Sequence, residues 1–447
     1  MRPLIALFVV FAAQSTSLAA AAEPHLIATL DIDATRHDLA TQTAAPLENS
    51  LSGNLLGGIG SGLAYAGGDT FLALPDRGPN ATPYDAAVDN TTSYYNRFHT
   101  FRFQLEPSAS GLPFTVKETL QQTTLFWSPT PLTYKGAAQA LNTTGRFYFD
   151  SRSDQFDPTK NSANPDNARF DSEGIRVSAD GRSVFVSDEY GPYLYQFDRA
   201  TGERLKSFAL PAKFAAMHLS SKGDDEVAGN DSGRVANKGM EGLAITPDGK
   251  TLVGMMQSPL AQDGGTKAPY VRIITVDIAN GATREYAYGL SNIGTADKPK
   301  YPGVSEIVAV NDHQFLVDER DGKGRGAGGE PSFKKLFLID LTGAAEVSDV
   351  SGAEALAGKA VAKTVFLDMV AGLKAGGVAT DAIPEKIEGV TFGPDVTQNG
   401  VVTHTLWIAS DNDFISMIDG KPNPNSVYVF GFSDADLAGF VHQKLAQ

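Results

Sequence analysis

The chain alternates short apolar segments with polar turns along most of its length. In His25–Ile32, Tyr193–Asp198 and Ser426–Phe432, apolar and polar residues follow one another with a period of two. This period predicts β-strands with one buried face. Asp-Gly and Gly-Gly turns separate several such segments, and few stretches follow the helical period. The pattern therefore predicts a turn-rich, all-β protein.

One two-strand unit recurs, in which a glutamate opens the first strand and acidic residues close the second. The opening residues lie 68, 65 and 82 residues apart and are Glu173, Glu241, Glu306 and Glu388. The closing residues are Asp188 with Glu189, Asp318 with Glu319, and Asp411, and Asp76 ends an earlier strand pair. Each span is long enough for a four-strand unit with insertions, so the repeat predicts a single β-propeller. Six blades are expected, with five or seven as alternatives.

The same pattern predicts which two strands close the ring and where insertions interrupt the blades. The strand Ser426–Phe432 is expected to pair with Ile27–Ile32 and so close the ring. Residues 79–169 lack a sustained pattern, apart from a strand at Asn96–Leu105, and are expected to form a long insertion. The Ala and Leu spacing from Thr342 to Ala379 is typical of a short helical insertion.

The first 22 residues have the features of a cleaved signal peptide. Arg2 precedes an apolar run from Leu4 to Ala13, and the small residues Ala19–Ala22 follow. We therefore expect a propeller domain over residues 23–447 that is periplasmic or secreted. No other segment approaches the length of a transmembrane helix.

The composition of the chain limits the kinds of molecule that it is expected to bind. The 447 residues carry a formal net charge of −15 and include no cysteine. An acidic chain is a poor partner for nucleic acid or for an anionic membrane. The absence of cysteine excludes disulfides and thiolate metal sites. A small molecule is the expected partner, and the sequence carries no signal for the oligomeric state.

The repeated carboxylates are expected to converge, because equivalent positions of propeller blades surround one channel. Converging carboxylates repel one another unless a cation compensates, and an oxygen-rich cluster favours Ca²⁺, with Mg²⁺ as the alternative. The candidate metal ligands are Glu173, Glu241, Glu306, Asp318, Glu388 and Asp411. The candidate catalytic residues are Asp76, Arg77, Asp188, Glu189, Glu319 and Arg320. The alternative is a structural role, in which these residues brace loops.

Other motifs carry little weight. Gly324–Gly329 fits G-x-G-x-x-G by letter but lacks the strand and helix of a dinucleotide site. No G-x-S-x-G elbow occurs, so there is no nucleophile signature of an α/β-hydrolase. The histidines, His404 among them, show no metal-ligand spacing and are expected to be surface or core residues.

The sequence around the repeat resembles the bacterial phytase-like propeller family, described as esterase-like activity of phytase. The resemblance runs from about residue 50 to 435 and is carried by Leu74–Gly78, Glu173-Gly174, Asp188–Pro192, Asn237–Leu243, Ser305-Glu306, Asp318–Arg320, Glu388–Pro394 and Ser410–Asn412. It implies distant kinship with calcium-dependent propeller phytases, which hydrolyse inositol phosphates with a Ca²⁺-activated water. A lysine-rich phosphate pocket is not evident, because Lys238 is the one basic residue close beside a repeat carboxylate.

Two main hypotheses follow. The first is an exported, Ca²⁺-dependent hydrolase of phosphate or carboxylate esters, with Glu189 or Glu319 as general base and with Arg77 and Arg320 stabilising negative charge. The second is a non-catalytic propeller that Ca²⁺ stabilises and that binds a small ligand or a protein. A lactonase-like or sugar-oxidising propeller is a third interpretation. If the opening and closing carboxylates lie at opposite ends of the channel, the closing set with Asp76 and Arg77 is favoured for chemistry.

Overall fold

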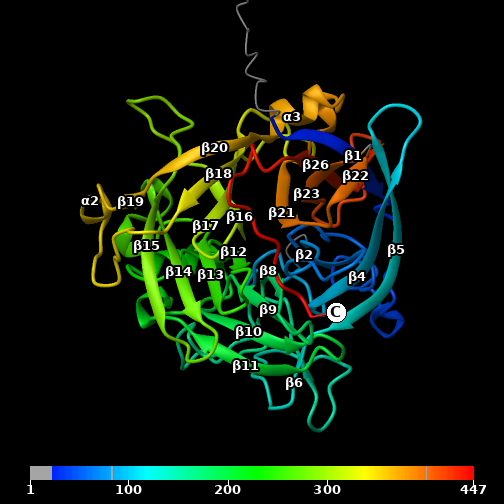
Figure 1. Cartoon of the computed structure of the whole chain (residues 1–447). Helices are drawn as coiled ribbons and strands as arrows, with labels where there is room; N and C mark the ends of the chain where they lie inside the picture. Colours follow the sequence, from blue (N-terminus) through cyan, green and yellow to red (C-terminus); the bar gives the residue numbers. More distant parts are fainter. Residues whose placement is uncertain (1–22, 82–83, 399, 447) are drawn as a thin grey trace, which may run out of the picture.

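Five sheets surround one axis in the computed structural model, which describes residues 23–81, 84–398 and 400–446 (Figure 1). Each sheet has four or five strands, and the innermost strands contact one another in a closed ring. The expected all-β propeller is therefore confirmed. It has five blades, one of the alternative counts, in place of the preferred six. The expected signal peptide, residues 1–22, lies outside the described residues.

The blades are numbered in chain order, and the strands of each blade are given from the channel outward. Blade 1 contains β2 (Gly62–Tyr65), β3 (Thr70–Leu74), β4 (Arg97–Pro107) and β5 (Phe114–Leu125). Blade 2 contains β8 (Ser172–Val177), β9 (Ser183–Asp188), β10 (Tyr193–Asp198) and β11 (Arg204–Ala209). Blade 3 contains β12 (Met240–Ile245), β13 (Thr251–Met256), β14 (Tyr270–Asp277), β15 (Thr283–Gly289) and β19 (Ala360–Val361).

The remaining two blades come from the second half of the chain and from its beginning. Blade 4 contains β16 (Gly303–Ala309), β17 (Gln314–Arg320), β18 (Lys334–Asp340) and β20 (Lys363–Asp368). Blade 5 contains β21 (Lys386–Phe392), β23 (Val401–Asp411), β26 (Asn425–Phe432) and β1 (His25–Ile32), and β22 (Val396–Gln398) also pairs with β23.

Short elements occupy the connections. Two further strand pairs are β6 (Trp127–Ser128) with β7 (Phe147–Tyr148) and β24 (Met417–Ile418) with β25 (Lys421–Pro422). The α-helices are α1 (Gly223–Ala228), α2 (Ala353–Leu356) and α3 (Met369–Ala375). The 3-10 turns are η1 (Thr41–Thr43), η2 (Ala212–Phe214), η3 (Ala261–Asp263), η4 (Gly265–Lys267) and η5 (Thr380–Ala382).

Blade 5 is completed by both ends of the propeller. Strand β1 pairs antiparallel with β26, and Leu30 lies opposite Val427. The predicted closing pair is therefore confirmed. Its backbone hydrogen bonds join the first strand of the ring to the last.

The two expected insertions differ from the structure. Residues 79–169 are not one insertion, because β4 and β5 are the outer half of blade 1. The middle of β5 is the exposed edge of its sheet, which explains its weak apolar period. The expected helical insertion is confirmed as α2 and α3, but β19 and β20 lie between these helices and belong to blades 3 and 4.

The hydrophobic core is divided among the five junctions between neighbouring blades. Between blades 5 and 1, Phe71, Phe103 and Trp407 pack together, and the ring centroids of Phe71 and Trp407 are 4.6 Å apart. Burying one such side chain stabilises the fold by about 1.5–3 kcal/mol. Apolar packing therefore holds the blades together, which leaves the channel free for polar residues.

One arginine fills the channel at the level of the inner strands. Arg176 is 3% exposed, and its guanidinium donates hydrogen bonds to carbonyls of four of the inner strands: those of Leu63, Ile175, Ile307 and Val390. Buried cations are found where such partners surround them. Arg176 thus separates the two mouths of the channel.

The C-terminal segment, residues 433–446, crosses one of these mouths and appears in red over the ring centre in Figure 1. Backbone N–H groups of this segment bond to blades 4, 3 and 2: Val441 to Val310, Lys444 to Pro247, and Ala446 to Ala179. The side chain of Gln443 adds a 2.7 Å bond to the carbonyl of Val177. We call this end of the channel the tail mouth and the other end the site mouth.

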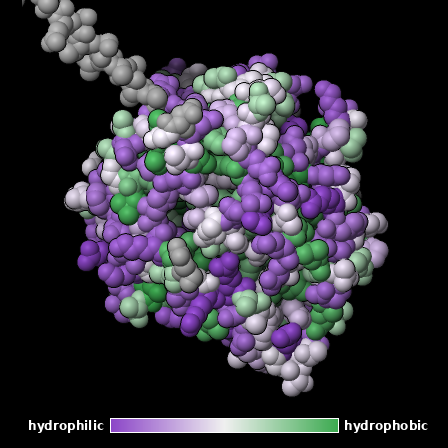
Figure 2. Space-filling model, turned by 45° about the vertical axis from the view of Figure 1, so that its right-hand side comes forward, coloured by the Kyte–Doolittle hydropathy of each residue, from purple (hydrophilic) through white to green (hydrophobic). Residues whose placement is uncertain are grey.

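On the face that Figure 2 shows, hydrophilic residues predominate and hydrophobic residues form small groups. Among the described residues, the helices are too short and too polar to cross a bilayer.

Candidate functional site

A β-bulge sets the position of one residue near the start of each of four inner strands. In β12, Met240 pairs with Met256 and Gly242 with Met255, so Glu241 has no partner of its own. The same irregularity occurs in β8, β16 and β21. A bulge re-aims the extra side chain. With the equivalent residue of blade 1, these positions form what we call the opening ring: Ser61, Glu173, Glu241, Ser305 and Glu388.

A second ring comes from the ends of the second strands, β3, β9, β13, β17 and β23. By the register of each hairpin, the members of this closing ring are Asp76, Glu189, Gln257, Arg320 and Asp411. The start of one strand and the end of its antiparallel partner lie side by side. The opening and closing residues therefore meet at one mouth of the channel, the site mouth, and not at opposite ends.

The site mouth holds a cavity of about 330 Å³. The acidic residues that line it are Asp76, Glu173, Glu189, Glu241, Glu385 and Glu388. The basic residues are Arg77, Lys238, Arg320 and Lys386, and the neutral polar ones are Asn237, Gln257 and Ser305. Such a lining suits a small, charged molecule.

Three of the four cations are already paired with carboxylates: Arg77 with Asp171 and Lys386 with Asp411, each at 3.2 Å, and Arg320 with Glu388. Lys238 instead donates a hydrogen bond to the amide oxygen of Gln257. Within the described residues no carboxylate lies within 4.0 Å of its Nζ. Lys238 is therefore the cation most available to a bound anion.

One carboxylate cluster has the composition of a hard-cation site. Asp171, Glu173 and Glu189 each bring one oxygen, and these oxygens lie within 4.8 Å of one another. Oε1 of Glu189 is buried without a hydrogen-bond partner. Burial, and then the charge of Glu241, raise the pKa values of Glu173 and Glu189 well above their usual range. An oxygen-only set with an unpaired buried oxygen fits Ca²⁺ or Mg²⁺.

A second cluster, Asp76 with Asp411 and Asp413, already has a cation of its own. Nζ of Lys386 lies 3.2 Å from Oδ2 of Asp411 and 2.5 Å from Oδ1 of Asp413. This ammonium compensates the negative charge where a metal ion would otherwise be needed. The first cluster is therefore the better candidate for a divalent cation.

Glu241 lies between the cluster and the cations. Burial and the charge of Glu388 raise its pKa, Lys238, a hydrogen bond from Gln257 and Arg320 lower it, and the net result is a pKa of about 7. Its Oε2 atom is buried without a hydrogen-bond partner. A carboxylate with a pKa near neutrality and a free oxygen is suited to proton transfer.

Two candidate catalytic residues, Asp188 and Glu319, do not line the cavity. Neighbouring residues of a strand point to opposite faces, so Glu189 and Arg320 face the cavity while the residues before them do not. Glu319 forms a buried ion pair with Lys363 between strands. Asp188 accepts backbone N–H groups of Asp171 and Tyr190.

Three candidate metal ligands, Glu306, Asp318 and Asp411, also lie outside the cavity lining. The bulge of β16 falls at Ser305, so Glu306 occupies the position that glycine has in the other blades. Its carboxylate reaches the channel interior, 2.9 Å from Nη2 of Arg176. Asp318 is completely buried, and burial raises its pKa well above its usual range.

The candidate residues from the sequence omit several residues of the site, including Asn237 and Glu385 of the cavity lining. Asp171, Gln257, Ser305 and Lys386 occupy positions at which the residue type changes from blade to blade, so matching of the repeated letters does not align them. Of these residues, Lys386 is the one that the sequence could best have indicated. It lies two residues before the opening-ring Glu388, so its side chain points into the same mouth. With Lys386, the cavity is more basic than the sequence predicted.

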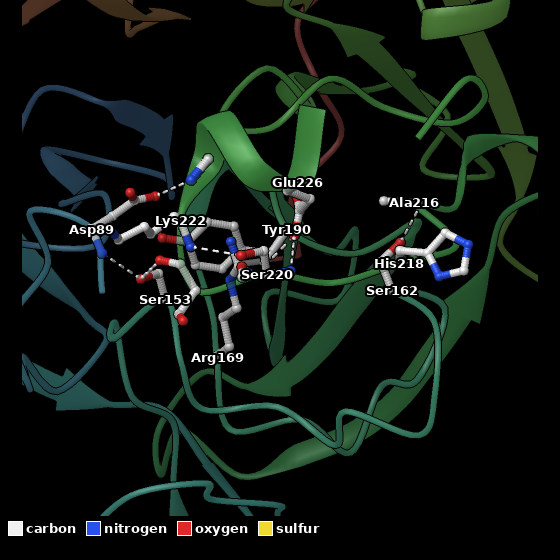
Figure 3. Close-up of polar contacts among 12 residues, drawn as sticks. Asp89, Ser153, Ser162, Arg169, Tyr190, Ala216, His218, Ser220, Lys222 and Glu226 are labelled. Atoms are coloured by element: carbon white, nitrogen blue, oxygen red, sulfur yellow. Dashed lines mark hydrogen bonds and ion pairs between the residues drawn. The ribbon is translucent and has the colours of Figure 1, made fainter. Parts of the chain in front are cut away.

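A buried network braces the loop that carries Glu189. Figure 3 shows Tyr190 beside Arg169 and Glu226, below the short helix α1. The guanidinium of Arg169 lies 3.7 Å from the ring centroid of Tyr190, and Glu226 pairs with both Arg169 and Arg234. Arg234 also donates to the carbonyl of Tyr190. These contacts fix the backbone next to Glu189.

Comparison with known proteins identifies related sequences. A family model described as "Phytase-like: Esterase-like activity of phytase" matches residues 54–414. A curated relative, an "Uncharacterized secreted protein" of Arthroderma benhamiae, is 38% identical over 135 residues. That match covers 27% of this chain and 26% of the relative, so the chain spans about a quarter of that relative's length.

Solved structures with some similarity include two that cover most of the chain. A putative 6-phosphogluconolactonase from Bacteroides uniformis is 12% identical with a TM-score of 0.31, over 81% of this chain and 83% of that one. Kuenenia stuttgartiensis hydrazine synthase is 10% identical with a TM-score of 0.28, over 80% and 78%. TM-scores of this size carry no conclusion for this chain.

Proposed function

Because the chain belongs to the phytase-like family, described as esterase-like activity of phytase, we propose that it is a hydrolase of phosphate or carboxylate esters. The proposed reaction takes place in the cavity of the site mouth and depends on a divalent cation, Ca²⁺ in preference to Mg²⁺. The observation that carries this proposal is the meeting of four cations and six carboxylates in one 330 Å³ cavity. The third interpretation, a lactonase-like or sugar-oxidising propeller, has no observation in its favour.

The divalent cation would be held by Asp171, Glu173 and Glu189, whose oxygens already lie together. A cation bound there would lower the pKa of a bound water and polarise the ester. The protein's own contribution is to gather three carboxylates in one place, although burial raises the pKa values of Glu173 and Glu189 well above their usual range. Arg77 neutralises Asp171 on its other side, which limits the net charge of the cluster.

Glu241 is the proposed general base. It would take a proton from the attacking water and return it to the leaving oxygen of the ester, for which a pKa near 7 is suitable. Lys238 and Arg320 lie close enough to influence that pKa, and they would stabilise the negative charge that develops on the substrate. This assignment replaces Glu189, which would hold the cation, and Glu319, which the ion pair with Lys363 holds away from the cavity.

Export is part of the same proposal. It is supported by the signal-peptide pattern of residues 1–22 and by a relative that is called a secreted protein.

The test is an assay of the mature chain on p-nitrophenyl phosphate, p-nitrophenyl acetate and phytate, with EDTA and after addition of Ca²⁺ or Mg²⁺. Turnover is expected with the metal and not with EDTA. Glu241→Gln is expected to lower kcat by about 10²–10⁴-fold with an unchanged melting temperature. Glu346→Gln, at an exposed position, is the matched control.

The competing hypothesis is a non-catalytic propeller that Ca²⁺ stabilises. No turnover of any ester, together with a melting temperature that Ca²⁺ raises, would overturn the hydrolase and support that alternative. Full activity of Glu241→Gln would overturn the assignment of the base alone.

A further inference from the structure

A second group of ligand-type side chains lies beside the tail mouth, away from the cavity described above. It consists of Asp395, between β21 and β22, His404 in β23 and His442 in the C-terminal segment. Oδ1 of Asp395 is 2.8 Å from Nδ1 of His404 and 2.8 Å from Nε2 of His442. One ligand atom of each residue lies within 4.8 Å of the other two. Two imidazoles and a carboxylate thus converge on one point.

A fourth residue supports this geometry independently. The other ring nitrogen of His404, Nε2, lies 3.0 Å from Oδ1 of Asp434. A metal-bound histidine usually donates its second N–H to a carboxylate, which fixes the tautomer and the ring orientation. Asp434 occupies that place, and it leaves Nδ1 of His404 directed at Asp395 and His442.

We propose that Asp395, His404 and His442 bind a zinc-type transition-metal ion, with Zn²⁺ as the ion of first choice. Imidazole and carboxylate donors suit Zn²⁺, whereas the oxygen-only cluster of the site mouth suits Ca²⁺. Around a four-coordinate Zn²⁺ with bonds of about 2.0–2.1 Å, neighbouring ligand atoms are about 3.3 Å apart. The 2.8 Å separations therefore need to widen by only about half an ångström.

The charges are consistent with such an ion. Asp395 and Asp434 bring two negative charges to His404, and a divalent cation would balance both. Three protein ligands leave the fourth position to water, because no fourth ligand-type side chain of the described residues belongs to the group. The side chains of Asp395 and His442 are 32% and 40% exposed, so an ion can enter from solvent.

The site would fasten the C-terminal segment to blade 5. His442 belongs to that segment, and Asp395 and His404 belong to the blade. Next to it, Phe440 packs on Phe392 with ring centroids 4.5 Å apart and on His404 at 5.0 Å. Since the same segment continues across the tail mouth, the proposed ion would hold that mouth closed.

The test is Zn²⁺ binding by the whole mature chain after chelator treatment, measured by equilibrium dialysis and metal analysis in excess Ca²⁺, which keeps the site mouth occupied. His442→Ala and His404→Ala are each expected to bind one Zn²⁺ fewer per chain than wild type. Zn²⁺ is expected to raise the melting temperature of wild type and not that of His442→Ala. His313→Ala is the matched control, because His313 also bonds an aspartate, Asp340, but belongs to none of the three-ligand groups found among the described residues.

Equal Zn²⁺ stoichiometry in wild type and His442→Ala would overturn the proposal. So would a loss of the same size in His313→Ala. Since the side chain of His442 is 40% exposed, its substitution is expected to leave the fold intact, which circular dichroism checks. Hydrolase activity is not a readout, so failure of this proposal and failure of the proposed function are distinguishable.

Discussion

Arg176 and Glu306 form an ion pair in the interior of the channel, where both side chains are almost completely buried. Glu306 also accepts the backbone N–H groups of Leu243 and Ile307. One pair of side chains thus ties the inner strands of blades 2, 3 and 4 to one another. This explains why a glutamate that matches the repeat by letter has a structural role and does not belong to the site mouth.

Arg176→Met is expected to lower the free energy of unfolding by about 3–5 kcal/mol, because it leaves a buried carboxylate without its partner. The double variant Arg176→Met with Glu306→Gln is expected to recover part of that loss. Urea unfolding, followed by circular dichroism, measures both. A single variant as stable as wild type would show that the pair does not hold the ring.

His99 provides a pH-dependent contribution to stability. It is fully buried, and burial lowers its pKa to about 4. Between about pH 6.5 and pH 4 the unfolded chain binds a proton that the folded chain does not, so this residue makes the fold less stable as the pH falls through that window.

His99→Gln removes this titration and keeps a group that can bond to Thr123, as Nδ1 of His99 does at 3.0 Å. The loss of stability between pH 7 and pH 5, measured from urea midpoints, is therefore expected to be smaller in the variant than in wild type. His25→Gln, at an exposed position, is the control. An unchanged difference between the two pH values would contradict the prediction.

At the scale of the element, glycine lets the inner strands approach one another behind each opening-ring residue. A Cβ atom at Gly242 would lie 2.8 Å from the backbone nitrogen of Ile307 in the next blade, and one at Gly389 would lie 2.9 Å from the carbonyl oxygen of Gly60. Contacts under 3.0 Å with backbone atoms force the strands apart. The repeated Glu-Gly pairs therefore combine a residue for the mouth with a residue for close packing.

Gly242→Ala is expected to lower the free energy of unfolding by about 1–3 kcal/mol through overpacking. Gly289→Ala is the matched control, because it is also a strand glycine and its added Cβ would meet nothing closer than 3.6 Å. Urea midpoints compare the two variants. Equal midpoints would mean that the inner strands can separate without cost.

The bulge also explains how far the sequence could predict the site. Glu173, Glu241, Glu388 and Glu189 could be found because acidic residues recur at equivalent positions of several blades. The sequence could not show which of Ser305 and Glu306 faces the site mouth. Glu306 matches the repeated glutamate by letter, but in β16 the bulge falls at Ser305, one residue before it. A one-residue change of register moves a side chain to the other face of a strand.

For the whole molecule, alternation and turn signals were sufficient for the propeller and its closing strand pair, but not for the number of blades. Two of the four strands of blade 1, β4 and β5, lie in a stretch without a clear apolar pattern, because β5 is the exposed edge of the sheet and has few apolar residues. Blade 3 receives β19 from a segment far along the chain. Such pairings depend on contacts between distant segments, which local periodicity does not report.

The pairing of β1 with β26 has a consequence for the order of events during synthesis. The first strand of the propeller is made at the beginning, and its partner is made almost 400 residues later. Until then β1 has no place in a sheet, although the strands of blades 1 to 4 already have theirs. Contacts between such distant residues form slowly. The ring can therefore close only after nearly the whole chain has been made, and a chain that is interrupted before β26 remains open.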